Sequence, residues 1–176
     1  MNNLDLAKLS SRAWSLPVLA HLSESDGCRV SPTAHAVGAG RNIVGQTFRH
    51  LADVGMLQRA AGHGHPLRPE FQLTPRGKAV AAWARTFLSG MSDNEWKTAR
   101  RAWTLPVLRL LRDPCTFTEL STSLQPVTDR GLSLCLSRMI GARFIEPRTM
   151  AELANGYVAI GRGRELTHTL DATFHL

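Results

Sequence analysis

The sequence predicts an α+β fold, predominantly helical, built as a tandem duplication. The first observation is that RAWSLPVLAHL, residues 12–22, returns as RAWTLPVLRLL, residues 101–111, with eight of eleven positions identical. The second is the length of 176 residues, which suits two units of about 90 residues each. The third is that each copy is followed by two helical patterns and then strand patterns. These features together predict a winged helix-turn-helix domain at residues 1–90 and another at 91–176.

The repeated segment predicts the start of a helix in each unit. Ser15 and Thr104 follow a tryptophan and are expected to cap the helices at their N-termini. Pro17 and Pro106 then fall in the first turn, where a missing N–H group costs little. The Val-Leu-x-x-Leu pattern that follows has the spacing of an apolar helix face.

In the first unit, VSPTAHAV predicts the first helix of the helix-turn-helix, and RNIVGQTFRHLADVGMLQR contains the second, which Gly55 is expected to end. The expected inward side chains of the second helix are Ile43, Val44, Thr47, Phe48, Leu51 and Val54. Strand patterns at MLQRA and LRPEFQL flank the turn GHGHP, so they predict a wing. TPRGKAVAAWARTFL then predicts a helix capped by Thr74.

In the second unit, CTFTELSTSL predicts a short apolar step at Cys115–Phe117 and then the first helix, with Leu120 and Leu124 inward. The segment after Thr128 predicts the second helix. Thr128 is expected to be the N-cap, and the inward stripe is expected to comprise Leu132, Leu136, Met139 and Ile140. A strand should begin at Phe144. The segment GYVAIGRGREL corresponds to the end of the first wing and its closing helix, with Arg162-Gly163 matching Arg76-Gly77.

The charge balance favours an anionic partner. The net charge is +7 and the pI about 10.3, as is common for proteins that bind nucleic acid. Residues 1–90 carry ten Lys and Arg against five Asp and Glu, whereas residues 91–176 carry eleven against nine. The apolar runs are too short to span a bilayer and the N-terminus does not resemble a signal peptide, so we expect a cytoplasmic protein without a membrane partner.

The ordered motifs resemble the HxlR-type winged helix-turn-helix regulators of bacteria. FTELSTSLQPVTDRGLSLCLSRM in the second unit and FQLTPRGKAV in the first carry the resemblance. Members usually have one such unit and bind DNA as homodimers. The resemblance therefore implies double-stranded DNA as partner and an intramolecular pseudo-dimer, acting as a monomer or as a homodimer. The helix at 75–89 and the segment 92–101 would pack where members dimerise.

The outward face of each second helix supplies the expected DNA contacts. In the first unit these are Arg41, Asn42, Gln46 and Arg49, with Arg59 and Arg68 on the wing. In the second unit they are Thr128, Asp129, Arg130, Ser133 and Arg138. Arginine suits guanine, whereas asparagine and glutamine suit adenine. Asp129 could accept a hydrogen bond from cytosine or only stabilise the helix start.

Other chemistries find little support in the sequence. His63 and His65 lie on a glycine turn and are expected to be ordinary wing residues, so no metal is expected. We expect no cofactor and no enzyme activity, because the usual catalytic motifs are not found. The three cysteines show no metal spacing and are expected to be reduced.

The four tryptophans have two possible roles. They are Trp14, Trp83, Trp96 and Trp103, and they either pack in a core or line a pocket for a flat, hydrophobic effector. The predicted function is a sequence-specific DNA-binding transcriptional repressor, modulated by such an effector. The alternative is a resistance protein that binds or sequesters an antibiotic-like small molecule on a winged-helix scaffold. A third possibility is a protein-interaction module.

Overall fold

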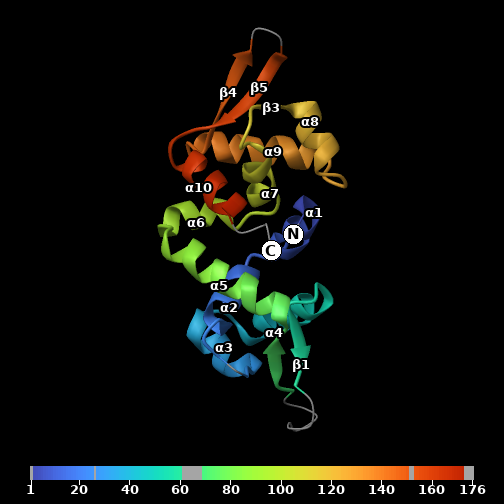
Figure 1. Ribbon diagram of the computed structural model, residues 1–176, viewed down its shortest axis with the longest axis vertical. Helices are drawn as coiled ribbons and strands as arrows, with labels where there is room; N and C mark the ends of the chain where they lie inside the picture. Colours follow the sequence, from blue (N-terminus) through green and yellow to red (C-terminus); the bar gives the residue numbers. More distant parts are fainter. Residues whose placement is uncertain (1, 26, 61–68, 151–152, 173–176) are drawn as a thin grey trace. The chain divides into compact units, whose positions relative to one another are not determined.

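The computed structural model describes residues 2–25, 27–60, 69–150 and 153–172 (Figure 1). These residues form a mixed α+β structure in which helices predominate and two small antiparallel sheets occur. Contacts divide the chain into two compact units. The first unit is Arg12–Met91; the second unit is Ser92–Leu176 together with Met1–Ser11. This differs from the expected division at 1–90 and 91–176, because the first eleven residues group with the second unit.

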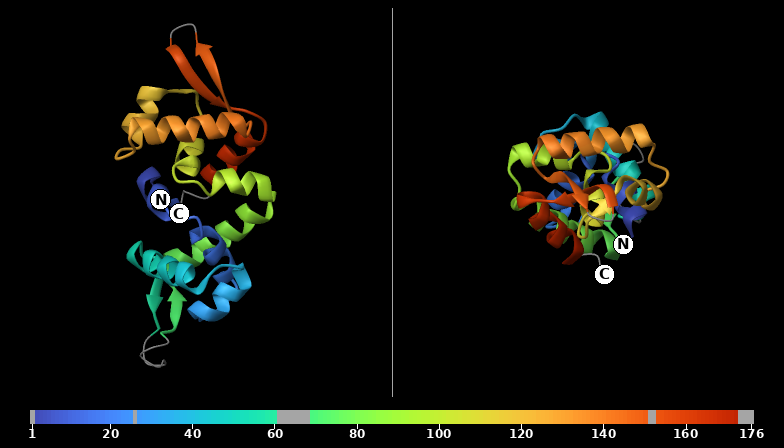
Figure 2. Two further views of the ribbon diagram at one scale, coloured as in Figure 1. Left: turned by 180° about the vertical axis from the view of Figure 1, so that it is seen from behind. Right: turned by 90° about the horizontal axis from the view of Figure 1, so that it is seen from above.

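The first unit contains a helix-turn-helix followed by a wing. Its elements are α2 (Ser15–Leu22), α3 (Val30–Val37), α4 (Arg41–Asp53), β1 (Leu57–Arg59), β2 (Phe71–Leu73) and α5 (Pro75–Ser89). Helix α2 packs along α5, and α3 packs on α4 (Figures 1 and 2). Strands β1 and β2 pair with Leu57 opposite Leu73, and Cys28 adds an isolated bridge to Phe71. The wing strands therefore continue directly from α4 and lead into α5.

The second unit has a related order of elements. They are α1 (Asn3–Ser10), α6 (Asp93–Ala99), α7 (Thr104–Leu110), β3 (Cys115–Thr116), α8 (Phe117–Ser123), α9 (Asp129–Gly141), β4 (Ile145–Met150), β5 (Leu153–Ala159) and α10 (Gly161–Ala172). The sheet order is β3-β5-β4, with Cys115 opposite Tyr157 and Ile145 opposite Ala159. Helices α1 and α10 both pack against α7. The β4–β5 hairpin projects beyond α9 (Figures 1 and 2).

A close backbone approach closes the wing of each unit. Gly77 and Gly163 are both the third residue of the helix that follows the wing. A Cβ atom on Gly77 would overlap the carbonyl of Met56, and one on Gly163 would overlap the carbonyl of Phe144. The same two carbonyls accept backbone hydrogen bonds from Thr74 and Ile160, each at 3.0 Å. Only glycine leaves room for this packing.

The two predicted N-caps are wrong by one residue. Helices α2 and α7 begin at Ser15 and Thr104, with Trp14 and Trp103 in the cap positions. Both hydroxyl side chains are buried, and Thr104 Oγ1 donates to the Thr98 carbonyl at 3.1 Å. The hydroxyl groups therefore lie inside the first turn, and neither helix has a side-chain hydrogen bond at its cap.

Three of the residues expected to face inward lie outside the core: Val54, the C-cap residue after α4, is partly exposed, and two isoleucines are exposed on their helices. Ile43 is 46% exposed and Ile140 is 37% exposed. The buried stripe of α4 consists of Val44, Thr47, Phe48 and Leu51, which have the spacing of one helix face. Ile43 and Ile140 are next to buried residues in sequence, but about 100° further round their helices. Apolar character alone did not distinguish them from core positions.

Candidate nucleic-acid interface

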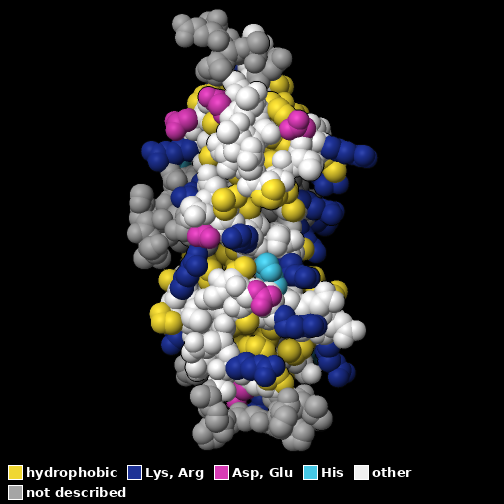
Figure 3. Space-filling model, turned by 90° about the vertical axis from the view of Figure 1, so that its right-hand side faces the viewer, with side chains coloured by type: hydrophobic (Ala, Val, Ile, Leu, Met, Phe, Trp, Pro, Cys, Tyr) yellow, Lys and Arg dark blue, Asp and Glu magenta, His cyan; other side chains and the backbone are white. Residues whose placement is uncertain are grey.

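The exposed face of α4 carries three polar residues in one row. Asn42, Gln46 and Arg49 follow the spacing i, i+4, i+7, so they lie along one stripe opposite the buried face. Arg41, at the first helical residue, is exposed as well. Lys and Arg (dark blue) are the prevailing charged side chains on the face of the protein drawn in Figure 3. The α4 stripe can donate and accept hydrogen bonds and can also contact phosphate groups.

Sequence reasoning missed one basic residue beside this stripe. Arg12 lies just before α2, is exposed, and donates from Nη1 to Gln46 Oε1 at 3.2 Å. Arg49 Nε lies 3.4 Å from the Gly45 carbonyl. Arg12 opens the repeated segment, so its sequence context indicated a helix start and gave no sign that it reaches α4. Its contact spans 34 positions and depends on how α2 packs on α4.

The wing of the first unit adds Arg59, which is exposed on β1. Arg68, His63 and His65 lie outside the described residues. At the base of the wing, Glu70 forms an ion pair with Arg29 at 3.5 Å. This pair connects the residue before α3 with the residue before β2.

In α9, two of the predicted contact residues stabilise the helix itself. Thr128 Oγ1 accepts a hydrogen bond from the Gly131 amide at 3.1 Å, which confirms its prediction as an N-cap. Asp129 Oδ1 accepts from the Ser121 hydroxyl at 3.0 Å, so it joins α9 to α8. These hydrogen bonds give both side chains a role within the fold.

The other three predicted residues of α9, namely Arg130, Ser133 and Arg138, are exposed. The row that corresponds to the α4 stripe contains Arg130, Leu134 and Ser137. Leu134 is 49% exposed and was not among the expected contacts. An apolar side chain therefore occupies the centre of this row, where α4 has an amide.

A capping box stabilises the helix before α9. The Thr116 hydroxyl accepts from the Glu119 amide at 3.2 Å, and the Glu119 carboxylate accepts from the Thr116 amide at 2.7 Å. The backbone hydrogen bond from Thr116 lowers the pKa of Glu119, with a contribution from the Thr116 hydroxyl. Helix α8 therefore begins at a well-defined residue, which fixes the turn that positions α9.

The four tryptophans are divided between the two units. Trp83 is 7% exposed and stacks on Phe87 with ring centroids 5.0 Å apart, so it belongs to the core of the first unit. Trp14 also lies in the first unit and is partly exposed. Trp96 and Trp103, both partly exposed, lie in the second. Core packing is thus shown for Trp83.

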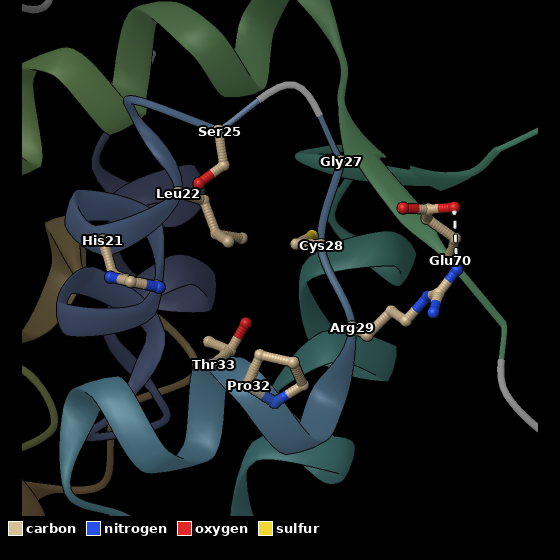
Figure 4. A pocket seen from close by; sticks show the side chains of 9 residues that line it. All are labelled: His21, Leu22, Ser25, Gly27, Cys28, Arg29, Pro32, Thr33 and Glu70. Carbon is tan, nitrogen blue, oxygen red and sulfur yellow. Dashed lines mark ion pairs between the residues drawn. The ribbon is translucent and has the colours of Figure 1, made fainter.

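The first unit also has a cavity of about 290 Å³ near the start of α3 (Figure 4). Its walls come from the end of α2, the segment before α3, the first turn of α3 and Glu70. Cys28 lies beside it, and burial raises the pKa of this thiol to about 12. Burial likewise raises the pKa of Cys135 in α9 to about 11. Both thiols are neutral at physiological pH and therefore poor nucleophiles.

Among the described residues, no three His, Cys, Asp or Glu side chains are grouped so that they could hold a metal ion. Within the same part of the chain, every helix is too short or too polar to cross a bilayer.

Comparison with known proteins identifies the first half of the chain. A family model described as HxlR-like helix-turn-helix matches residues 9–96. The match is half as long as the chain and contains all of the first unit, including α3, α4 and both wing strands. No match was found among curated proteins. With its helix-turn-helix and wing inside the matched segment, the chain belongs to the HxlR-like helix-turn-helix family.

Proposed function

We propose that this protein is a sequence-specific transcriptional repressor that binds double-stranded DNA. Membership of the HxlR-like helix-turn-helix family indicates a DNA-binding transcription regulator. The single observation that carries the more specific proposal is the exposed row Asn42, Gln46 and Arg49 on α4. Second helices of such motifs insert this kind of face into the major groove.

The residues of the first unit divide into two roles. Asn42, Gln46 and Arg49 lie where base edges would be read, because they form the centre of the exposed face. Arg41 at the helix start and Arg59 on the wing are suited to phosphate groups. Phosphate contacts of this kind make affinity fall with salt. The logarithm of the binding constant drops by about 0.9 for each neutralised phosphate when the salt concentration rises tenfold.

The second half of the chain is proposed to be a duplicate of the first. Support comes from the repeated segments at 12–22 and 101–111, the related order of elements, and the matching positions of Gly77 and Gly163. Such a chain would act as a pseudo-dimer. If both units bind DNA, their half-sites should lie about one helical turn, 10 base pairs, apart. If only the first unit reads DNA, the second is a scaffold.

A ligand-binding role is the second candidate. The cavity beside Cys28 gives a small molecule a specific location, next to the Arg29–Glu70 ion pair that joins α3 to the wing. A repressor would use this site for an effector, whereas a sequestering protein would use it as its main function. Tight compound binding together with weak, sequence-independent DNA binding would favour the sequestering protein.

The proposal is tested by fluorescence anisotropy on two labelled duplexes across a salt series. One duplex comes from the region upstream of the protein's own gene, and the other is its scrambled counterpart. We expect nanomolar, selective and salt-dependent binding to the first duplex. Equal binding to both duplexes that disappears near physiological salt would contradict the proposal.

A matched pair of variants then assigns the binding face. Arg41→Ala/Arg49→Ala should weaken binding to the upstream duplex by about 100-fold, because it removes one phosphate and one base contact. Arg130→Ala/Arg138→Ala removes the same charge from α9 and should have a smaller effect. Unchanged affinity of the first variant would refute the assignment of α4 as the reading helix.

A further inference from the structure

We infer that Arg12 and Gln46 act as one recognition unit that reads guanine in preference to adenine. The inference rests on the proposed function, because it specifies what α4 would recognise. Its starting point is the hydrogen bond from Arg12 Nη1 to Gln46 Oε1 at 3.2 Å, between two exposed side chains. Gln46 lies in the centre of the α4 stripe, so this bond is located where a base edge would be contacted.

The chemistry of arginine determines how the Gln46 amide is turned. A guanidinium group has only donors, so the amide must present its oxygen to Arg12. The Nε2 amino group of Gln46 then points to the other side, where it can donate. No described carboxylate forms an ion pair with Arg12, so its positive charge stays next to the amide. The pair therefore offers an incoming base edge mainly donors and positive charge.

Base edges in the major groove respond differently to such a pair. Guanine presents two acceptors, N7 and O6, whereas adenine presents the N7 acceptor and the N6 amino donor. A glutamine that acts alone can bind adenine by using its oxygen and its nitrogen together. Arg12 already uses one of the two lone pairs of the Gln46 oxygen, and its positive charge beside the other lone pair disfavours the approach of an amino group. Guanine is consequently the better partner, in contrast to the adenine preference that glutamine alone indicates.

The second unit provides an internal control for this arrangement. The residues that correspond to Arg12 and Gln46 there are Arg101 and Leu134. Leucine offers no acceptor, so Arg101 cannot fix a neighbouring amide in this way. The recognition unit is thus a property of the first unit, and changing Arg101 should leave its base preference unaltered.

The test begins with selection of binding sites from a random pool of duplexes by the full-length protein. Affinities for the selected site are then measured by anisotropy, with each base pair replaced in turn. The position read by Gln46 is the base pair at which the Gln46→Leu variant no longer prefers one base over the others. We expect the wild type to prefer guanine over adenine there by about tenfold. Arg12→Ala should shift that position toward adenine, and Arg101→Ala should not.

Each outcome bears on the inference separately from the proposed function. Selective enrichment with adenine preferred at the Gln46 position would overturn the inference and leave DNA binding intact. An unchanged guanine preference in the Arg12→Ala variant would also overturn the inference and leave DNA binding intact, provided that circular dichroism shows this variant to be folded. If no sequence is enriched at any salt concentration, the proposed function itself fails, and the inference fails with it.

Discussion

The two helices α4 and α9 are alike on one side and different on the other. Each has thirteen residues and is followed by a strand. Their buried stripes have the same spacing: Val44, Thr47, Phe48 and Leu51 in one, Leu132, Cys135, Leu136 and Met139 in the other. Their exposed rows differ, with Asn42, Gln46 and Arg49 in α4 and Arg130, Leu134 and Ser137 in α9. Packing therefore constrains the buried side only, and the exposed side can acquire a different function.

The net charges of the two halves of the chain also differ, and the half that contains α4 is the more positive. Residues 1–90 carry a net charge of +5 and residues 91–176 a net charge of +2. In α9, the acidic Asp129 is also held at the first turn by Ser121. A weaker electrostatic attraction and an apolar centre both make α9 the less suitable helix for reading DNA.

The largest effect is expected when the exposed row of α9 is placed on α4. Asn42→Arg, Gln46→Leu and Arg49→Ser together should lower specific affinity by about 100-fold or more, because the amide of Gln46 and the charge of Arg49 are lost and Asn42 is replaced by a side chain that suits a different base. Thermal stability should change little, since the buried stripe is intact. Anisotropy on the selected site and thermal unfolding measure the two quantities. Retained specificity would show that the difference between the two rows has no role in recognition.

The wing glycines test whether the similarity between the units extends to their packing. Gly77→Ala and Gly163→Ala should each destabilise the unit that contains them by about 1–3 kcal/mol, because the added methyl group overlaps a backbone carbonyl. Hydrogen exchange followed by mass spectrometry assigns the loss to one unit. Gly141→Ala is the control, since nothing lies within 4 Å of its added Cβ atom. A tolerated substitution at either wing glycine would contradict the close approach.

The smallest effect concerns the starts of the two helices. Thr128→Ala should destabilise the second unit by about 1 kcal/mol, because it removes the acceptor for the Gly131 amide. Helix α4 starts after Gly40, which has no capping side chain. Gly40→Ser should therefore stabilise the first unit, but only by a few tenths of a kcal/mol. Urea denaturation measures both changes, and equal shifts of the same sign would show that capping does not distinguish the helices.

The helix-turn-helix helices and the wing strands were predicted well because their signals are local, whereas α1 and α6 were not predicted. The spacing of Val44, Phe48 and Leu51 predicts a buried helix face, and Thr74 followed by Pro75 predicts a capped helix start. Both predictions are confirmed, since α4 buries that face and Thr74 Oγ1 accepts from the Gly77 amide at 2.9 Å. Exposure was predicted less well: Ile43 and Ile140 were expected to face inward but lie on the outer faces of their helices.

By itself, the sequence determined the helix-turn-helix class, the excess of positive charge, and the row Asn42, Gln46 and Arg49, because each follows from residue type and helical period. The tertiary structure decided three other features. It grouped residues 1–11 with the second unit, engaged Asp129 with Ser121, and placed Arg12 against Gln46. Contacts of this kind join segments whose separation is set by helix packing. Periodicity within one segment carries no information about them.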